Sequence, residues 1–218
     1  MLDPEAIATT LNTALPGVVL EVVGNPAPGG QASLRLDPAR AREAALFLRD
    51  DPGLRLDYAS NATGVDWPDR EVKESVTVKE VVEGQEKEVT KSVVNTIPGY
   101  LEAVYHLYSM EKKHGPLVVR LRTGDRKQDV RLPSLTPVWR SCEFQEREIY
   151  DLFGIVFDGH PDLRRILLWD GFQDHPMRKD YVAPDDFEWE PTPHDEVLER
   201  AKQHQAAVAP KAEEGGAA

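Results

Sequence analysis

The segment from Glu146 to Tyr181 constrains the fold and the use of this chain more than any other stretch of its sequence. It contains two units in which a His-Pro pair is followed by basic residues, at 160–165 and 175–179. A residue before proline is held in extended or turn backbone, which places both units in loops. So many fixed turns and charged side chains favour a surface that another protein binds over a pocket built for chemistry.

The composition of the 218-residue chain limits the kinds of protein that it can be. With 38 acidic and 26 basic residues the net charge is −12, which argues against sequence-independent nucleic-acid binding because such binding needs a basic footprint. The single cysteine, Cys142, leaves no intramolecular disulfide and too few thiolates for a cysteine-ligated iron–sulfur cluster. The acidic start is not typical of a secretory signal, and no stretch reaches the ~18–20 apolar residues of a membrane span. We therefore expect a cytoplasmic chain that contacts a membrane only through a complex.

Apolar periodicity and turn residues predict an α+β fold. The 3.6-residue period predicts helices at 3–15, 37–49 and about 136–153, of which the first two begin with an Asp-Pro pair. Short β-rich runs bounded by turn residues predict strands at 18–23, 33–36, 54–58, 100–108, 117–122 and 130–132. We expect these elements to form a mixed β-sheet of about five or six strands with helices mainly on one face.

Two segments are expected to depart from this body. Residues 69–96 alternate Val and Thr with Lys and Glu around a central turn, which predicts an inserted, projecting β-ribbon. Residues 182–218 lack a core pattern and predict an extended C-terminal arm that ends in a disordered tail. The arm carries Phe187 and Trp189, and two large aromatic residues are typical of a segment that lies on another protein. The predicted domain is therefore 1–181.

Residues 138–153 predict a helix with two different faces when they are placed at ~100° per residue. On the charged face, Glu143–Arg147 and Arg147–Asp151 are i,i+4 pairs of opposite charge. Two interpretations stay open: a face exposed to solvent, or charges that meet a partner protein. The apolar face contains Val138, Cys142, Ile149, Leu152 and Phe153, and the charged face contains Arg140, Glu143, Arg147 and Asp151.

Glu146 is exceptional because it lies on the apolar side of this helix. A buried carboxylate is costly unless it is paired or neutralised. It is expected first to form a structural tie with an arginine of the same chain, Arg164 or Arg165. A contact with a partner protein and a role as a catalytic acid or base are the alternatives.

The same segment offers little for catalysis. His160, His175 and His194, with nearby aspartates, are candidate metal ligands, but neither His-Pro histidine has the i,i+4 spacing of a helical zinc site. We therefore expect no metal site. We expect the histidines to form hydrogen bonds with backbone groups and so to hold the shape of the segment. Cys142 is expected to be inert packing. A metal-dependent hydrolase that uses Glu146 with His160 and His175, and an acidic adaptor of a nucleic-acid complex, are the competing hypotheses.

These residues are similar to the signature of the 30 kDa subunit family of respiratory complex I (NADH-quinone oxidoreductase), whose bacterial members are its C subunits. That signature begins with Glu-Arg-Glu, two further residues, an acidic residue and two apolar residues. A gap of six residues follows, then a His, and the signature ends with a basic residue and two apolar residues. The matching residues are Glu146-Arg147-Glu148, Asp151, Leu152-Phe153, His160, Arg164, Ile166 and Leu167. The resemblance covers about residues 30–181 and leaves the ribbon and the end of the tail outside the family's common core.

The resemblance implies a non-catalytic structural subunit of the enzyme's hydrophilic arm, supporting electron transfer from NADH to quinone coupled to proton translocation. It implies no cofactor in this chain, because FMN and the iron–sulfur clusters belong to other subunits. The implied partners are the quinone-site D subunit, on which the C-terminal arm would lie, and the cluster-bearing B and I subunits, on the cytoplasmic side of the cell membrane. The equivalent subunit of a related membrane-bound hydrogenase-type complex is an alternative.

No residue is expected to be catalytic, to bind a cofactor or to bind a metal. The residues expected at the partner interface are Glu146, Arg147, Glu148, Tyr150, Asp151, His160, Pro161, Asp162, Arg164, Arg165, His175, Pro176, Arg178, Lys179, Phe187 and Trp189.

Overall fold

A five-stranded mixed sheet forms the centre of the molecule, in the order β1-β2-β7-β6-β3. The computed structural model describes residues 2–27, 30–82 and 85–183, with the side chains of all of these except 73–93. β2 and β7 are parallel, while the other neighbours are antiparallel, so the predicted mixed sheet is confirmed. The strands are β1 (Val19–Val23), β2 (Ser33–Leu36), β3 (Tyr58–Trp67), β6 (Tyr100–Ser109) and β7 (His114–Arg122).

Three α-helices begin and end where local chemistry requires. α1 (Pro4–Ala14) starts at Asp3, whose carboxylate accepts the Glu5 N–H at 3.1 Å. α2 (Ala41–Asp50) follows a 3-10 turn, Pro38–Arg40, that Asp37 caps in the same way. α3 (Cys142–Phe153) ends at Gly154, whose φ of 76° is readily available to glycine. Among the described residues no helix is long and apolar enough to cross a membrane.

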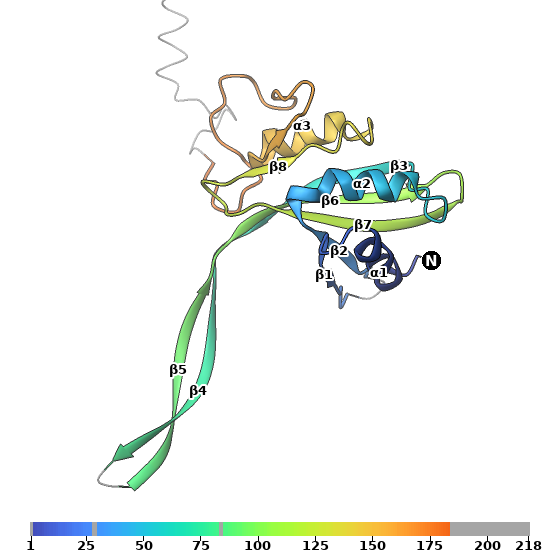
Figure 1. The fold of residues 1–218 in the computed structure, drawn as a ribbon. Coiled ribbons are helices and arrows are strands. Elements are labelled where there is room, and N and C mark those ends of the chain that lie inside the picture. The colour runs from blue at the N-terminus through green and yellow to red at the C-terminus, as the bar shows by residue number, and fades with distance from the viewer. Residues whose placement is uncertain (1, 28–29, 83–84, 184–218) are drawn as a thin grey trace, which may run out of the picture.

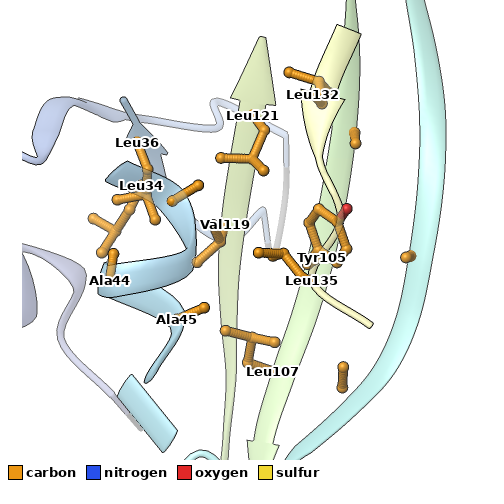
Figure 2. Close-up of a cluster of buried hydrophobic side chains, with 14 of the residues drawn as sticks. Leu34, Leu36, Ala44, Ala45, Tyr105, Leu107, Val119, Leu121, Leu132 and Leu135 are labelled. Carbon is orange, nitrogen blue, oxygen red and sulfur yellow. The ribbon is translucent and has the colours of Figure 1, made fainter. Parts of the chain in front are cut away.

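The hydrophobic core lies on one face of the sheet. Along β2, β6 and β7, every second side chain turns to the same side, which places Leu34, Tyr105 and Val119 in one layer. Buried side chains of all three helices belong to the same cluster as these strand residues. Figure 2 shows Ala44 and Ala45 of α2 gathered with side chains of β2, β6 and β7. The prediction of helices mainly on one face is confirmed.

The ribbon is present as predicted and extends away from the sheet (Figure 1). It consists of β4 (Arg70–Val82) and β5 (Gln85–Ile97), which pair antiparallel along their whole length. At its base the Gly99 N–H donates to the Asp69 carboxylate at 2.6 Å. Of the predicted C-terminal arm, residues 184–218, with Phe187 and Trp189, lie outside the described residues.

Two predicted elements were wrong in detail, and one strand pairing was not predicted. The third helix begins at Cys142 rather than near Thr136, because the residues before it form turns in which the Val138 N–H donates to the Leu135 carbonyl and the Cys142 N–H to the Trp139 carbonyl. The strand expected at 54–58 is a turn up to residue 57, where Arg55 has a φ of 45°. The short strand β8 (Arg131–Pro133) pairs in parallel with β9 (Val156–Asp158), which the sequence pattern did not indicate.

The contact between β3 and α3 leaves no space at Gly64. A Cβ there would lie 2.4 Å from Cδ2 of Phe153, a buried ring that cannot swing away. We therefore expect Gly64→Ala to lower the free energy of unfolding by about 1–3 kcal/mol in urea denaturation. Gly24→Ala is the matched control, because a Cβ at Gly24 meets nothing within 4 Å. Equal stabilities of the two variants would contradict this packing.

Candidate functional site

The chain from Gly154 to Ala183 lies beside α3, and apart from β9 it contains no helix or strand (Figure 1). It includes both His-Pro units. Its backbone therefore needs hydrogen-bond partners other than a helix or a sheet. Several of those partners are on α3.

Asp151 of α3 holds the middle of the segment. Its Oδ2 accepts three consecutive backbone N–H groups, from Ile166, Leu167 and Leu168, at 3.0, 2.7 and 2.9 Å. Its Oδ1 accepts from the Arg165 guanidinium at 2.7 Å. Burial alone would raise the pKa of Asp151, but these four donors outweigh burial and hold it below its usual value. The carboxylate is thus charged and fully used inside the chain.

Arg147 and His160 hold the first His-Pro unit. Arg147 donates from Nε to the Arg164 carbonyl at 3.2 Å and from Nη2 to the Arg165 carbonyl at 3.1 Å. His160 lies 2.9 Å from the Glu143 carbonyl through Nε2 and 3.1 Å from the Asp162 N–H through Nδ1. A carbonyl only accepts and an N–H only donates, so the ring is the neutral tautomer with its proton on Nε2.

The second His-Pro unit binds the C-terminal end of α3. The last carbonyls of a helix have no hydrogen-bond donors within the helix, and here the segment supplies the donors. His175 donates from Nδ1 to the Asp151 carbonyl at 3.0 Å, and Arg178 donates from Nε to the Phe153 carbonyl at 2.6 Å. Burial lowers the pKa of His175, which keeps the ring neutral. The expectation that the histidines hydrogen-bond backbone is confirmed for His160 and His175, whereas His194 lies outside the described residues.

A second anchor ties the end of the segment to the sheet. Asp66 of β3 accepts both arms of the Arg126 guanidinium, at 2.7 and 2.6 Å, and the Lys179 N–H at 2.7 Å. Arg126 also pairs with Asp180 at 3.1 Å. The segment is therefore fixed to α3 along its middle and to β3 at its end.

The expected charged face of α3 was wrong for two residues. Arg147 and Asp151 are 6% and 0% exposed, and neither forms the predicted i,i+4 pair. Asp151 pairs with Arg165, and Glu143 lies 3.7 Å from Arg140. The segment folds over this side of the helix and takes both side chains as backbone partners, which the helical period alone does not reveal.

Glu146 is a structural tie, as expected, but not to an arginine. Its carboxylate accepts from Tyr105 Oη at 3.1 Å, Ser134 Oγ at 2.5 Å, Leu135 N at 2.7 Å and Thr136 Oγ1 at 3.0 Å. It is 0% exposed, and burial raises its pKa although all four donors act to lower it. The carboxylate joins α3 to β6 and to the 134–136 turn, and it faces no open site.

The interior offers no reactive group among the described residues. Burial raises the pKa of the Cys142 thiol to about 12, so it is inert packing as predicted. Within the described ranges no cluster of three or more His, Cys, Asp and Glu side chains could hold a metal. The titratable residues of the segment act as hydrogen-bond partners of backbone and of each other.

The segment presents large apolar side chains outward beside exposed charged ones such as Arg164. Between Phe144 and Met177, five large apolar side chains of α3 and of the segment are 38–61% exposed, and we call them the exposed apolar set. Sequence reasoning counted two of them in the family signature but placed none at the interface. The available signal was the presence of large apolar residues within a charged loop. The set is Phe144 (60%), Ile166 (38%), Leu167 (61%), Trp169 (42%) and Met177 (56%).

The residues predicted at the interface divide into two groups. Arg164 has a side chain that is 68% exposed and pairs only locally, with Asp162. Residues that stay accessible or partly accessible are Glu148, Tyr150, His160, Pro161, Asp162, Arg164, His175, Pro176 and Lys179. Those whose polar groups are used inside the chain are Glu146, Arg147, Asp151, Arg165 and Arg178, and the partly accessible His160 and His175 are also used in this way. The interface assignment itself stays a prediction for both groups.

Comparison with known proteins gives one consistent relationship. The family described as "Respiratory-chain NADH dehydrogenase, 30 Kd subunit" matches residues 34–187. A relative from Roseiflexus castenholzii, named as the C subunit of NADH-quinone oxidoreductase, is 35% identical over 179 residues, covering 82% of this chain and 84% of the relative. The protein of the same name from Salinispora arenicola is 37% identical over 152 residues, 70% of this chain and 50% of the relative.

Two solved structures are also similar. A trypsin-resistant fragment of Nqo5 aligns at 25% identity with a TM-score of 0.46, covering 73% of this chain and 98% of the fragment. A chain of an archaeal respiratory membrane complex, the membrane-bound sulfane sulfur reductase, aligns at 17% identity with a TM-score of 0.49, covering 91% of each chain.

The buried Glu146 gives a pH-dependent prediction for the free chain. Its folded-state pKa is raised, so its contribution to stability is present below the unfolded pKa of about 4.3 and is lost as pH rises through the folded pKa. Glu146→Gln removes this titration. Its amide can keep Oε1 on the Leu135 N–H and donate to hydroxyls that reorient.

We expect the unfolding free energy of wild type minus that of Glu146→Gln to fall as pH rises above about 4. Urea denaturation at a series of pH values measures the difference. Glu148→Gln, at an exposed position of the same helix, is the control, and we expect no such pH-dependent difference in unfolding free energy between it and wild type. A wild-type advantage that grows with pH would show instead that the carboxylate is stabilised in its charged form.

Proposed function

Because this chain belongs to the 30 kDa subunit family of the respiratory-chain NADH dehydrogenase, we propose that it is a non-catalytic structural subunit of an NADH-quinone oxidoreductase. The observation that supports a structural role is the exposed apolar set, held outward on a segment whose backbone is fixed from within. Large exposed apolar side chains on a rigid support are typical of a protein interface. The buried acids and histidines stabilise that support.

The assignment of partners is also proposed. The chain contacts the quinone-site D subunit and the cluster-bearing B and I subunits through the 146–181 segment. It carries no cofactor, and the complex binds FMN and iron–sulfur clusters in other subunits. Its place is the cytoplasmic side of the cell membrane, as a peripheral part of a complex that passes electrons from NADH to quinone with proton translocation.

The experiment replaces one residue of the exposed apolar set with a charge. Leu167→Glu would bury a carboxylate against a partner, which costs more than ~1.4 kcal/mol, or a factor of 10 in affinity. We expect at least a tenfold loss of the chain from the complex, with a parallel loss of NADH-quinone activity. The measurement is the amount of tagged chain recovered with other oxidoreductase subunits from cells that lack the native gene.

Leu46→Glu is the matched control. Leu46 is a 43% exposed leucine on α2, so the same charge enters a comparably exposed apolar position away from the segment. Both free variants should unfold at the wild-type temperature. If the two variants assemble equally well, the exposed apolar set is not an interface. If the wild-type chain recovers no oxidoreductase subunit, the proposed function is wrong.

A further inference from the structure

The main sheet has a second face that is built from arginines. In the parallel pair β2–β7, Arg35 lies opposite Arg120, and in β6–β7, Arg122 lies opposite Glu102. Because strand side chains alternate, these residues are on the face opposite Leu34 and Val119. The two buried valines of this face, Val104 and Val118, lie outside the core cluster to which all three helices contribute. We call Arg35, Arg120 and Arg122 the arginine face.

The side chains of these arginines are partly covered. The side chains of Arg35, Arg120 and Arg122 are 25%, 21% and 27% exposed, so their stems cover the sheet while their heads reach solvent. Glu102 is completely buried beneath them and accepts from Arg120 at 3.2 Å and Arg122 at 2.9 Å. Arg35 pairs with Glu21 at 3.0 Å. Three cations therefore face two carboxylates, which leaves a local positive charge on a chain of net charge −12.

The arginine face also has guanidinium N–H donors that no acceptor among the described residues uses. A guanidinium carries five N–H donors, whereas each of these three makes one hydrogen bond to a carboxylate within the described ranges. Nε of Arg120 and Nδ1 of the neighbouring His106 are buried without a partner among the described residues. Planar arginines with free donors bind carboxylates in pairs of hydrogen bonds. The chemistry that completes this face is a carboxylate-bearing surface.

The arginine face continues into the 146–181 segment. Trp67, 41% exposed, donates from Nε1 to Glu102 at 2.8 Å on the arginine side. The Lys179 ammonium, from the segment, lies 5.8 Å from the centroid of the Trp67 ring. A protein seated on the segment would therefore reach the arginine face across this exposed tryptophan. A second copy of this chain would bring the same positive face against itself, which like charges oppose.

We propose that the arginine face is a second docking surface, which binds an acidic segment of another protein in the assembly by guanidinium–carboxylate contacts. The interaction is distinct from that of the exposed apolar set, because charge rather than apolar area carries it. It extends the proposed function and rests on it only for the identity of the assembly.

The first experiment compares arginine reactivity. Phenylglyoxal, which modifies accessible guanidinium groups, is applied to the free full-length chain and to the purified complex, and the modification of Arg35 is followed by mass spectrometry. We expect modification of Arg35 to be at least tenfold slower in the complex. Equal rates in the two samples would overturn the proposal.

Two other occupants give distinct results that also overturn it. If Arg35 is protected in the free chain and becomes reactive when residues 184–218 are deleted, the occupant is the chain's own acidic C-terminal segment. If protection in the free chain depends on protein concentration, the occupant is a second copy. A wild-type chain absent from the oxidoreductase would overturn the proposed function, whereas an assembled complex with a reactive Arg35 overturns only this inference.

Charge reversal gives the second experiment. Arg35→Glu should lower recovery of the chain in the complex at least tenfold, and Arg35→Lys should have a smaller effect because it keeps the charge and loses the planar fork. Arg131→Glu is the control, since Arg131 is also an arginine paired across two strands with one carboxylate, that of Asp158. Equal recovery of Arg35→Glu and Arg131→Glu, with both free chains folded, would overturn the proposal.

Discussion

The carboxylate of Asp151 is the constraint on which the shape of the 146–181 segment depends. Three successive backbone N–H groups and one guanidinium converge on it, and none of these donors has a helix or a strand to satisfy it. Because Asp151 is on a helix whose far side is packed on the sheet, the position of residues 166–168 follows from the position of the core. The exposed side chains Ile166 and Leu167 are thereby presented on a rigid backbone, which lowers the entropy lost when a partner binds.

The buried acids of this chain serve structure in the same manner. Glu146 joins α3 to β6 and a turn, Asp66 holds the end of the segment, and Glu102 supports two arginines on the opposite face. Each has hydrogen-bond donors around it that oppose the desolvation of the carboxylate, although at Glu146 burial outweighs its four donors and raises the pKa. This structural use of acids supports the proposed binding role of a segment rich in histidine and aspartate.

The sequence predicted the elements well and the orientation of polar side chains poorly. Alternation with a central turn was sufficient for the β4–β5 ribbon, and the His-Pro pairs were sufficient for loops, because both signals are local. Arg147 and Asp151 were placed on an exposed helix face, since a helical period records polarity and not partners. Their partners are backbone groups of the later segment, which carry no residue-type signal. The hydroxyls around Glu146 and the carboxylate beneath Arg120 and Arg122 likewise come from distant elements.

The central claim is that Asp151 fixes the segment before any partner is bound, and hydrogen exchange of the free chain tests it most directly. The amides of Ile166, Leu167 and Leu168 should be protected by a factor of about 100 or more in wild type, although their segment is exposed. Protection should be lost in Asp151→Asn and kept in Asp162→Asn, where the replaced carboxylate is exposed and binds only neighbouring charges. Rapid exchange of these amides in the wild-type chain, or protection that persists in Asp151→Asn, would contradict the account.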